Sequence, residues 1–414
     1  MTAPSPAPTT TPSETFSFPT RGTLLGDAEA AAVAEIIGSP DRLTQGVWRD
    51  RFEQQFREYA GARHAISVTS GTVALETAIR LLDLRPGDQV VVTPQTFQAT
   101  IQPLLDSPAE VVFCDVEPGT LNLDPAALDA VVTDRTAAVI LVHYGGLPAR
   151  MTEITAIARR HGAVVIEDCA HALGARHRGR RPGALADIGC FSFHGTKALT
   201  TLGEGGMITL DRDDWAERLD RVRSNDADYR SLPYAGPDPE PALLPWMRYS
   251  DDIYRRTCTR WHRAGTNATL SEAAAAVGVV QLGRLPELTA RRRAVATRLD
   301  AATASFPLVR THRPHPGDEH AHHLYTCFVD APVIRERLVR TLHTHGVEVQ
   351  LRYFPLHLTP EWRARGHHRG ECPAAERSWF DHQVNLPCPP SLTDRQADRL
   401  ASVLHDCLTL AHRI

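Results

Sequence analysis

The chain has 414 residues, of which 42% are hydrophobic and 23% charged, values typical of a globular protein long enough for two domains. Its net charge of −4 gives no reason to expect nucleic acid or an anionic membrane surface as a partner. No segment approaches the roughly 18 consecutive apolar residues of a membrane-spanning helix, so we expect a soluble, cytoplasmic protein.

The eight cysteines are widely scattered, and neither they nor the 20 histidines form a cluster with metal-ligand spacing. This pattern predicts reduced thiols and no bound metal. The first residues are rich in proline, threonine and serine, and we expect a disordered tail over residues 1–20. No basic segment followed by an apolar core marks a signal peptide there.

Helical periodicity predicts two helices, at 26–37 and 49–59. A short strand at 64–69 then runs through the small residues Ser70, Gly71 and Thr72 into a helix at 73–82. Such a turn can bind an anion, because the free N–H groups and the dipole of the helix both point at it. An ordinary strand-to-helix turn without a ligand is the alternative interpretation.

Solid hydrophobic runs predict further strands, and helices are expected between them, one from Gln98 and one at 151–161. This alternation indicates a parallel sheet that is covered on both faces. Ligands bind beyond the carboxyl ends of such strands, where Phe97, Tyr144 and Asp168 join the turn at Ser70. The predicted strands are 89–93, 111–115, 138–143 and 163–167.

The remainder of the chain, from about residue 305 to 414, alternates strands with helices and predicts a smaller α/β domain. A glycine loop and a strand at 202–210 and a helix at 215–223 precede an irregular segment, 225–264, whose length suggests a functional role. We expect a large domain over 21–265 and a small domain over 266–414. The helices predicted beyond 264 are 270–282, 285–303, 331–346 and 394–411, and the strands are 324–329 and 347–353.

Lysine and arginine together number 45, and Lys197 is the only lysine, so the other 44 are arginines. Arginine does not lose a proton near neutrality, and a single retained amine therefore suggests amine chemistry, although chance in an arginine-rich chain is the alternative. Pyridoxal phosphate needs a phosphate cradle, a carboxylate for its ring nitrogen and a lysine for a Schiff base. The turn at Gly71, Asp168 and Lys197 offer all of these.

Other residues near these could serve the same ligand. The hydroxyl of Ser192 could reach the phosphate, the ring of Phe97 could stack on the cofactor, and His171 follows Asp168 closely. Arg352 and His357 could line the pocket from the small domain, although a buried-core or surface role is at least as good an interpretation, and Tyr144 could equally pack or contact the cofactor. A structural role is the better interpretation for Glu204 and for the arginine-rich hairpin at 177–181.

The strings IEDCAHALGA at 166–175 and FSFHGTK at 191–197, with GEGG at 203–206, resemble the DegT/DnrJ/StrS family of sugar aminotransferases. The family patterns are E-D-A-A-[HQ]-A-x-G-A and F-S-F-H-x-T-K, followed by G-E-G-G. The resemblance covers roughly residues 22 to 412. It implies the fold type I of pyridoxal phosphate enzymes, with a mostly parallel, seven-stranded type of sheet in the large domain, and a homodimer that shares its active sites.

The resemblance also assigns roles to single residues. It implies that Lys197 carries the cofactor and that Asp168 pairs with the pyridine nitrogen. The residues implied to bind or flank the cofactor are Gly71, Thr72, Phe97, His171 and Ser192. Asn267 matches the asparagine of the segment G-Y-N-Y-R-M, which reaches the phosphate of the neighbouring subunit. Residues 265–270, GTNATL, keep only the glycine and the asparagine of this segment.

These residues lead to the hypothesis of an aminotransferase that moves an amino group from glutamate or glutamine to a ketone of a sugar, nucleotide-linked or free, or of a cyclitol. An antibiotic-type aminosugar pathway is the family-level expectation. A sugar dehydratase that uses the same cofactor is the first alternative, although its known 3-dehydratase relatives carry histidine in place of Lys197. A non-catalytic member that keeps only the fold is the second.

Overall fold

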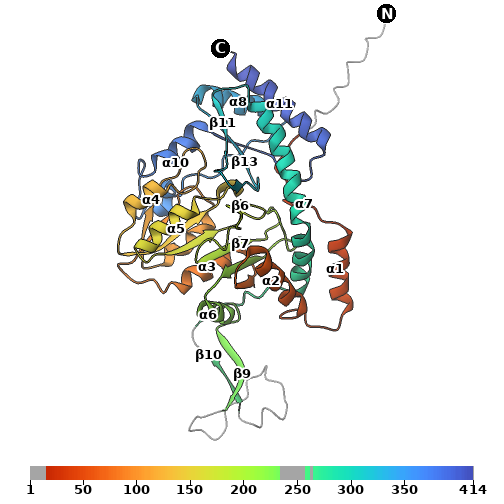
Figure 1. The fold of residues 1–414 in the computed structure, drawn as a ribbon, viewed down its shortest axis with the longest axis vertical. Helices are drawn as coiled ribbons and strands as arrows, with labels where there is room; N and C mark the ends of the chain where they lie inside the picture. The colour runs from red at the N-terminus through yellow and green to blue at the C-terminus, as the bar shows by residue number, and fades with distance from the viewer. Residues whose placement is uncertain (1–14, 234–256, 262–263, 414) are drawn as a thin grey trace, which may run out of the picture.

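The computed structural model describes residues 15–233, 257–261 and 264–413. Its centre is a seven-stranded sheet with the strand order β1-β8-β7-β5-β4-β2-β3 (Figure 1). The pairs from β3 to β7 are parallel, and β8 runs antiparallel to both of its neighbours. The predicted parallel sheet is confirmed. Its strands are β1 (His64–Val68), β2 (Gln89–Val92), β3 (Glu110–Phe113), β4 (Thr136–Val142), β5 (Val164–Asp168), β7 (Ile188–Ser192) and β8 (Gly206–Leu210).

Hydrophobic clusters cover both faces of this sheet, which explains why its strands are apolar without alternation. Val90 and Val92 of β2 face a cluster with α3, whereas Val91 between them faces a cluster with α4 and α5. The helices of this N-terminal part of the chain are α1 (Asp27–Gly38), α2 (Val47–Ala60), α3 (Gly71–Leu81), α4 (Pro125–Val131), α5 (Met151–Arg160) and α6 (Asp213–Arg223).

The helix predicted from Gln98 is wrong, because two short 3₁₀ turns, Gln98–Thr100 and Gln102–Asp106, occupy this stretch. Pro103 lies in the first turn of the second one, where its ring cannot donate a backbone hydrogen bond to the residues before it. A further 3₁₀ turn, Tyr144–Gly146, follows β4.

The C-terminal part forms a three-stranded antiparallel sheet with the order β11-β13-β14, which packs against α8, α11 and the end of α7. The predicted strand at 347–353 is wrong, because within the described part of the chain this stretch forms only two isolated bridges, Val347 with Phe16 and Gln350 with Asn385. Beyond them the N–H of Arg352 donates to the side chain of Asn385. The strands are β11 (Val309–Thr311), β13 (Tyr325–Val329) and β14 (Gln383–Leu386). The helices are α8 (Pro332–Thr344), α9 (Pro360–Arg363), α10 (Pro373–Arg377), followed by a π-helical turn (Ser378–His382), and α11 (Asp394–His412); a 3₁₀ turn (Leu356–Leu358) precedes α9.

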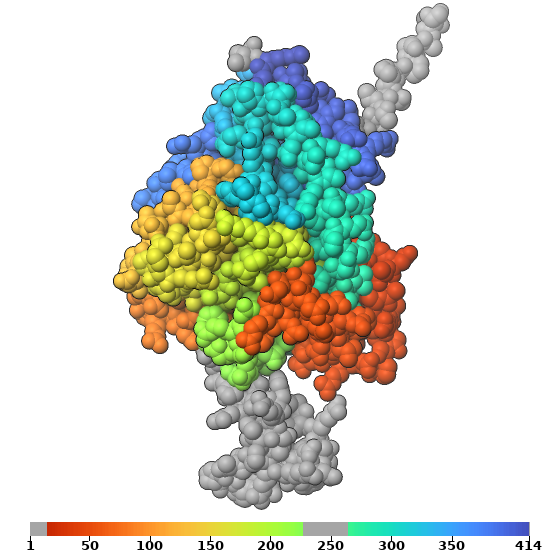
Figure 2. All heavy atoms as spheres, in the orientation of Figure 1, coloured from red at the N-terminus to blue at the C-terminus, as the bar shows by residue number. Residues whose placement is uncertain are grey.

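The two helices predicted at 270–282 and 285–303 are one 32-residue helix, α7 (Glu272–Thr303), with Pro286 inside it. Proline in a helix costs a hydrogen bond, but packing on both sides of it holds the helix together. Leu282 and Leu285 lie in the cluster of the large sheet, and Leu299 lies in the C-terminal cluster. Figure 2 shows the first helices, in red, against the teal atoms of α7. The boundary between these two hydrophobic clusters therefore lies within α7. The domain limits at 265 and 266 remain a prediction.

The tail predicted over residues 1–20 is ordered at its end. Phe16 is only 3% exposed and forms a bridge with Val347, and its backbone N–H donates to the carbonyl of Gly346 at 2.8 Å. A buried aromatic ring in the C-terminal cluster gives this segment the apolar contact that its composition did not predict. Residues 1–14 lie outside the described part of the chain.

The irregular segment predicted at 225–264 begins and ends with strands. β9 (Ala227–Pro233) and β10 (Thr257–Trp261) form an antiparallel ribbon that projects from the body of the molecule beside α6 (Figure 1). Residues 234–256 lie outside the described part. The hairpin predicted at 177–181 is confirmed by a bridge between His177 and Arg180, and its strand β6 (Arg176–His177) pairs with β12 (Asp318–Glu319). Among the described residues, no helix is both long enough and apolar enough to cross a membrane.

Candidate active site

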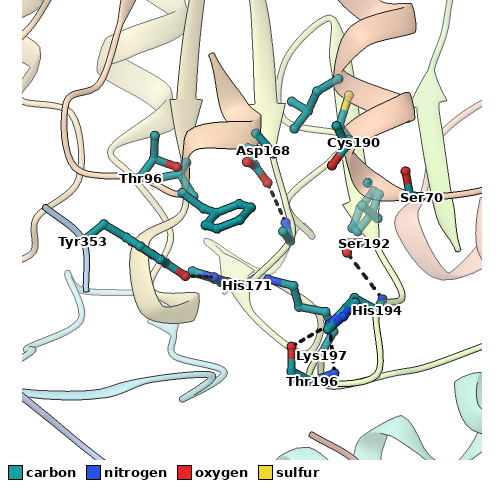
Figure 3. A pocket seen from close by; sticks show the side chains of 18 of the residues that line it. Ser70, Thr96, Asp168, His171, Cys190, Ser192, His194, Thr196, Lys197 and Tyr353 are labelled. Atoms are coloured by element: carbon teal, nitrogen blue, oxygen red, sulfur yellow. Dashed lines mark hydrogen bonds between the residues drawn. The ribbon is translucent and has the colours of Figure 1, made fainter. Parts of the chain in front are cut away.

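A cavity of about 560 Å³ opens where the parallel strands end. All the predicted site residues except Asn267 line it (Figure 3). They come from the ends of β1, β2, β5 and β7, which the sheet topology brings to one edge. These residues are Gly71, Thr72, Phe97, Asp168, His171, Ser192 and Lys197.

One end of the cavity is the N-terminus of α3. The Ser70 hydroxyl accepts a hydrogen bond from the Val73 N–H at 3.1 Å and so caps the helix. A Cβ atom on Gly71 would lie 2.6 Å from Cβ of Ser192, so only glycine lets the end of β7 approach this closely. The first N–H groups of the helix and the Ser192 hydroxyl thus form a cradle that suits a phosphate group.

Asp168 is the last residue of β5 and is 4% exposed. Its carboxylate accepts hydrogen bonds from the Thr100 hydroxyl at 2.7 Å and from the Ala170 N–H at 2.9 Å. Burial raises the pKa of Asp168, and these two hydrogen bonds and the charge of Lys197 oppose that rise. Among the described residues no cation lies within ion-pair distance, so the carboxylate can take a protonated ring nitrogen as its partner.

Lys197 follows β7 through a tight turn in which its N–H donates to the carbonyl of His194 at 2.8 Å. The turn sends the side chain back into the cavity, toward Asp168 (Figure 3). Burial lowers the pKa of Lys197 from 10.5 to about 8; the charge of Asp168 raises this pKa and that of Arg352 lowers it further. An amine with this pKa is partly neutral near physiological pH and can act as a nucleophile and as a base.

His171 and Tyr353 form the opposite wall of the cavity. The Tyr353 hydroxyl lies 3.2 Å from Nε2 of His171, and the imidazole stacks on His323 with the ring centroids 4.3 Å apart. Burial lowers the pKa of His171 well below its usual value, so the ring is neutral at pH 7. Phe97 keeps 52% of its surface exposed beside this wall, with its ring centroid 5.9 Å from that of Tyr353. An exposed ring at this place offers a stacking surface.

These features fit pyridoxal phosphate. Gly71 and Ser192 form a cradle that a larger residue at 71 would fill, and Asp168 is buried without a cation partner among the described residues. His171 carries a buried Nδ1 atom with no hydrogen-bond partner in the described part of the chain. Lys197 is the amine that the cofactor requires for attachment.

The structure adds Thr96, Thr100 and Tyr353, to which the sequence assigned no role, and it places Arg352 in the cavity. Thr100 and Thr96, whose hydroxyls lie 2.7 Å apart, extend the hydrogen bonds of Asp168. Arg352 and Tyr353 enter the cavity from the C-terminal part of the chain, although a buried-core or surface role was at least as good an interpretation of Arg352. The available signal for Tyr353 was the string YFPLH at 353–357, which directly follows Arg352 and is part of the family resemblance.

The remaining residues that the sequence raised lie elsewhere. Tyr144 and His357 are fully buried, as the packing interpretation predicted; His357 pairs with Glu376 at 2.9 Å. Glu204 lies at the rim of the cavity with an exposed side chain. Asn267 is exposed, lies outside the cavity and bridges to Ser224 through its backbone. Its role toward a neighbouring subunit stays a prediction.

An aspartate at the end of β5 and a lysine just beyond β7, beside an anion-binding helix terminus, define the class of pyridoxal phosphate-dependent enzymes. The sequence model of the DegT/DnrJ/EryC1/StrS aminotransferase family matches residues 24–405, and the chain belongs to this family. The expected fold class, the enzyme class and the cofactor, pyridoxal phosphate, are thereby confirmed.

Relatives of this family resemble the whole chain. The spore coat polysaccharide biosynthesis protein SpsC of Bacillus subtilis is 33% identical over 392 residues, which are 92% of this chain and 95% of SpsC. The aminotransferase TlmJ from Streptoalloteichus hindustanus is 30% identical with a TM-score of 0.83, covering 96% of this chain and all of TlmJ. DesV of S. venezuelae is 30% identical with a TM-score of 0.79, covering 93% and 95% of the two chains.

Proposed function

We propose that this enzyme transfers an amino group from glutamate or glutamine to a ketone of a sugar, nucleotide-linked or free, or of a cyclitol. The observation that carries the proposal is the cavity in which the only lysine of the chain lies beside Asp168 and the anion-binding turn at Gly71. Family membership supports a sugar as the acceptor class.

Each of these residues has a definite task in the proposed reaction. Gly71, Thr72 and Ser192 would hold the phosphate, and Asp168 would hold the ring nitrogen in its protonated state. The cofactor supplies an electron sink for the donor's α-carbon when it is bound. Lys197, with a pKa of about 8, could accept the proton of the donor's α-carbon and pass it to the cofactor. Phe97 would stack on the ring.

We also propose a homodimer in the cytoplasm, in which Asn267 contacts the cofactor of the neighbouring subunit. The exposed position of Asn267 outside its own cavity supports a role across an interface. The seven cysteines whose side chains the structure describes are free, which suits a reducing compartment.

A specialised acceptor of antibiotic-type secondary metabolism fits two features of this chain. The ribbon of β9 and β10 projects beside α6, and residues 265–270 lack the aromatic side chains and the arginine of the family segment. Residues 265–270 do not line the cavity of their own subunit, and we assign this altered segment and the ribbon to the recognition of the acceptor.

The two half-reactions test this function separately. Glutamate or glutamine is added to the cofactor-loaded protein, and the visible absorbance of the bound cofactor is followed while the 2-oxo acid is quantified. We expect one equivalent of oxo acid per site, followed by recovery of the original spectrum when a suitable keto-sugar or keto-cyclitol is added. A spectrum that ignores both donors, together with loss of water from a sugar, would instead establish the dehydratase.

A further inference from the structure

Among the described residues, Arg352 is the only arginine that lines the cavity. Its Nε donates a hydrogen bond to Oε1 of Gln350 at 2.6 Å, and among the described residues no carboxylate lies within 4.0 Å of its guanidinium. The guanidinium carbon lies 5.3 Å from the centroid of the Phe18 ring, which supports one of its faces. The half-buried cation therefore has unused capacity for an anion in the cavity.

Buried side chains fix the backbone of Arg352 from several directions. Its N–H donates to Oδ1 of Asn385 at 2.9 Å, and its carbonyl accepts hydrogen bonds from Tyr144, Gln383 and Gln95. All four side chains are fully buried, and buried polar groups are costly unless they are paired. This network holds the start of the Arg352 side chain at one place in the wall of the cavity.

Arg352 is better placed than the neighbouring Arg292 to bind an anion in the cavity. Arg292 lines a small pocket that shares Arg352 and Thr196 with the main cavity. Its guanidinium, however, is buried and donates hydrogen bonds to the carbonyls of Gly22 and Cys388. Arg352 faces Lys197 with a like charge and lowers its pKa, which a bound anion would relieve.

The phosphate of the cofactor has its own cradle. In Figure 3, Ser70 and Ser192 lie on one side of Lys197 and Tyr353, the neighbour of Arg352, lies on the other. An amino acid always carries an α-carboxylate, whereas the hydroxyl groups of a sugar are uncharged. The planar fork of a guanidinium matches a carboxylate with two parallel hydrogen bonds.

We propose that Arg352 binds a carboxylate of the amino donor and thereby selects an amino acid for the first half-reaction. This inference rests on the proposed function and adds the residue that recognises the donor. A phosphate of a nucleotide-linked acceptor has similar chemistry, and the two half-reactions separate these sources.

The first experiment measures binding without turnover. Glutarate has the carboxylates of glutamate but no amino group, and it is titrated by calorimetry into the cofactor-loaded protein. We expect Arg352→Gln to weaken glutarate binding by about 10- to 100-fold, the range of a charge-assisted pair. Arg352→Lys keeps the charge but loses the fork, and we expect a loss of about 3- to 10-fold. Arg340→Gln, on the exposed face of α8, is the matched control and leaves binding unchanged.

The second experiment measures each half-reaction in a single turnover. In Arg352→Gln, the glutamate concentration for half-maximal rate rises by about 10- to 100-fold, while the limiting rate changes less. The acceptor step is measured on protein already converted to its amino form, and its rate stays within about twofold of the wild type.

Specific results would overturn the inference. Unchanged glutarate binding in Arg352→Gln contradicts it, and so does a defect confined to the acceptor step, which would assign Arg352 to an acceptor phosphate. If Arg352→Gln does not fold, Arg352→Lys decides the question through the same titration. A wild-type protein that ignores every amino donor would instead refute the proposed function, which keeps the two failures distinct.

Discussion

Lys197 is subject to three influences that its position at the end of β7 creates. Burial and the charge of Arg352 favour the neutral amine, and Asp168 favours the ammonium form. The balance is a pKa of about 8, where the amine can both attack a carbonyl and exchange protons near neutrality. Because this pKa differs from that of the unfolded chain, the protonation of Lys197 makes the free energy of unfolding of the cofactor-free protein depend on pH.

Above pH 8 this protein is expected to gain stability from Lys197. Because its pKa falls from 10.5 in the unfolded chain to about 8 in the fold, the unfolded state binds more protons between these values. The free energy of unfolding therefore rises with pH in this window, by up to about 1.4 kcal/mol per pH unit. Urea unfolding of cofactor-free wild type and Lys197→Met across this range measures the difference. An equal pH dependence in both proteins would contradict the lowered pKa.

Asp168→Asn tests the partner of the ring nitrogen. An amide retains similar shape and can still accept a hydrogen bond from Thr100, but it has no charge to hold a proton on a ring nitrogen. We expect the rate of the glutamate half-reaction to fall by about 100-fold or more, with cofactor still attached at Lys197. Stopped-flow absorbance measures the rate and the spectrum before mixing measures the cofactor content. Wild-type rates in this variant would remove Asp168 from the chemistry.

The sequence predicts the residues that lie at strand ends and inside short motifs, such as Lys197, Asp168 and Ser192. It offers Arg352 as a lining residue only beside a packing alternative, and it assigns no role to Tyr353. Their segment lies more than 150 residues after Lys197 and is held by side chains such as Asn385 rather than by a strand. Hydrogen bonds between side chains and backbone so far apart in the sequence leave no periodic pattern that would predict them.

At the level of elements, the N-terminus of α3 is the feature that sets the phosphate position. Gly71→Ala places a Cβ atom 2.6 Å from Cβ of Ser192, so α3 and the end of β7 must move apart. We expect the affinity for pyridoxal phosphate to fall by about tenfold or more, measured by titration of the cofactor-free protein.

Gly283→Ala is the matched control, because the added Cβ meets no atom within 4 Å on the exposed side of α7. This variant should keep its cofactor affinity and gain about 0.5–1 kcal/mol of stability, since alanine favours a helix over glycine. Equal cofactor affinities in the two variants would show that the close approach at Gly71 is not needed for the cradle.

Elements with strong local patterns agree with the sequence, and those set by tertiary contacts do not. The apolar runs of β2, β4 and β5 identify strands, because strands buried on both faces leave no other pattern. Pro286 suggests a break between two helices, yet Leu285 and Leu288 are buried beside it and the helix continues. The hydrogen bond that proline removes is outweighed by contacts with residues far away in the sequence, which a local pattern cannot show.

At the level of the whole molecule, α7 joins the two hydrophobic clusters. Leu285 is 2% exposed among residues of the large sheet, and Leu299 is fully buried in the C-terminal cluster. A rigid connection of this kind keeps Arg352 and Tyr353 at the wall of a cavity that belongs mostly to the large sheet.

Leu285→Ala and Leu299→Ala test this connection. Each leaves a cavity in a different cluster, and each should lower the free energy of unfolding by about 2–5 kcal/mol. Because one helix spans both clusters, we expect a single unfolding transition in both variants, followed by circular dichroism in urea. Two separated transitions in either variant would show that the two parts of the chain unfold independently.

The proposed chemistry depends on Lys197 as the attachment point of pyridoxal phosphate. The cofactor-loaded protein is reduced with borohydride and digested, and the peptides are analysed by mass spectrometry. Since Lys197 is the only lysine, we expect a pyridoxyl adduct on this residue and no visible cofactor band after reduction. Protein loaded with pyridoxal phosphate that carries no adduct on Lys197 would contradict the proposed chemistry.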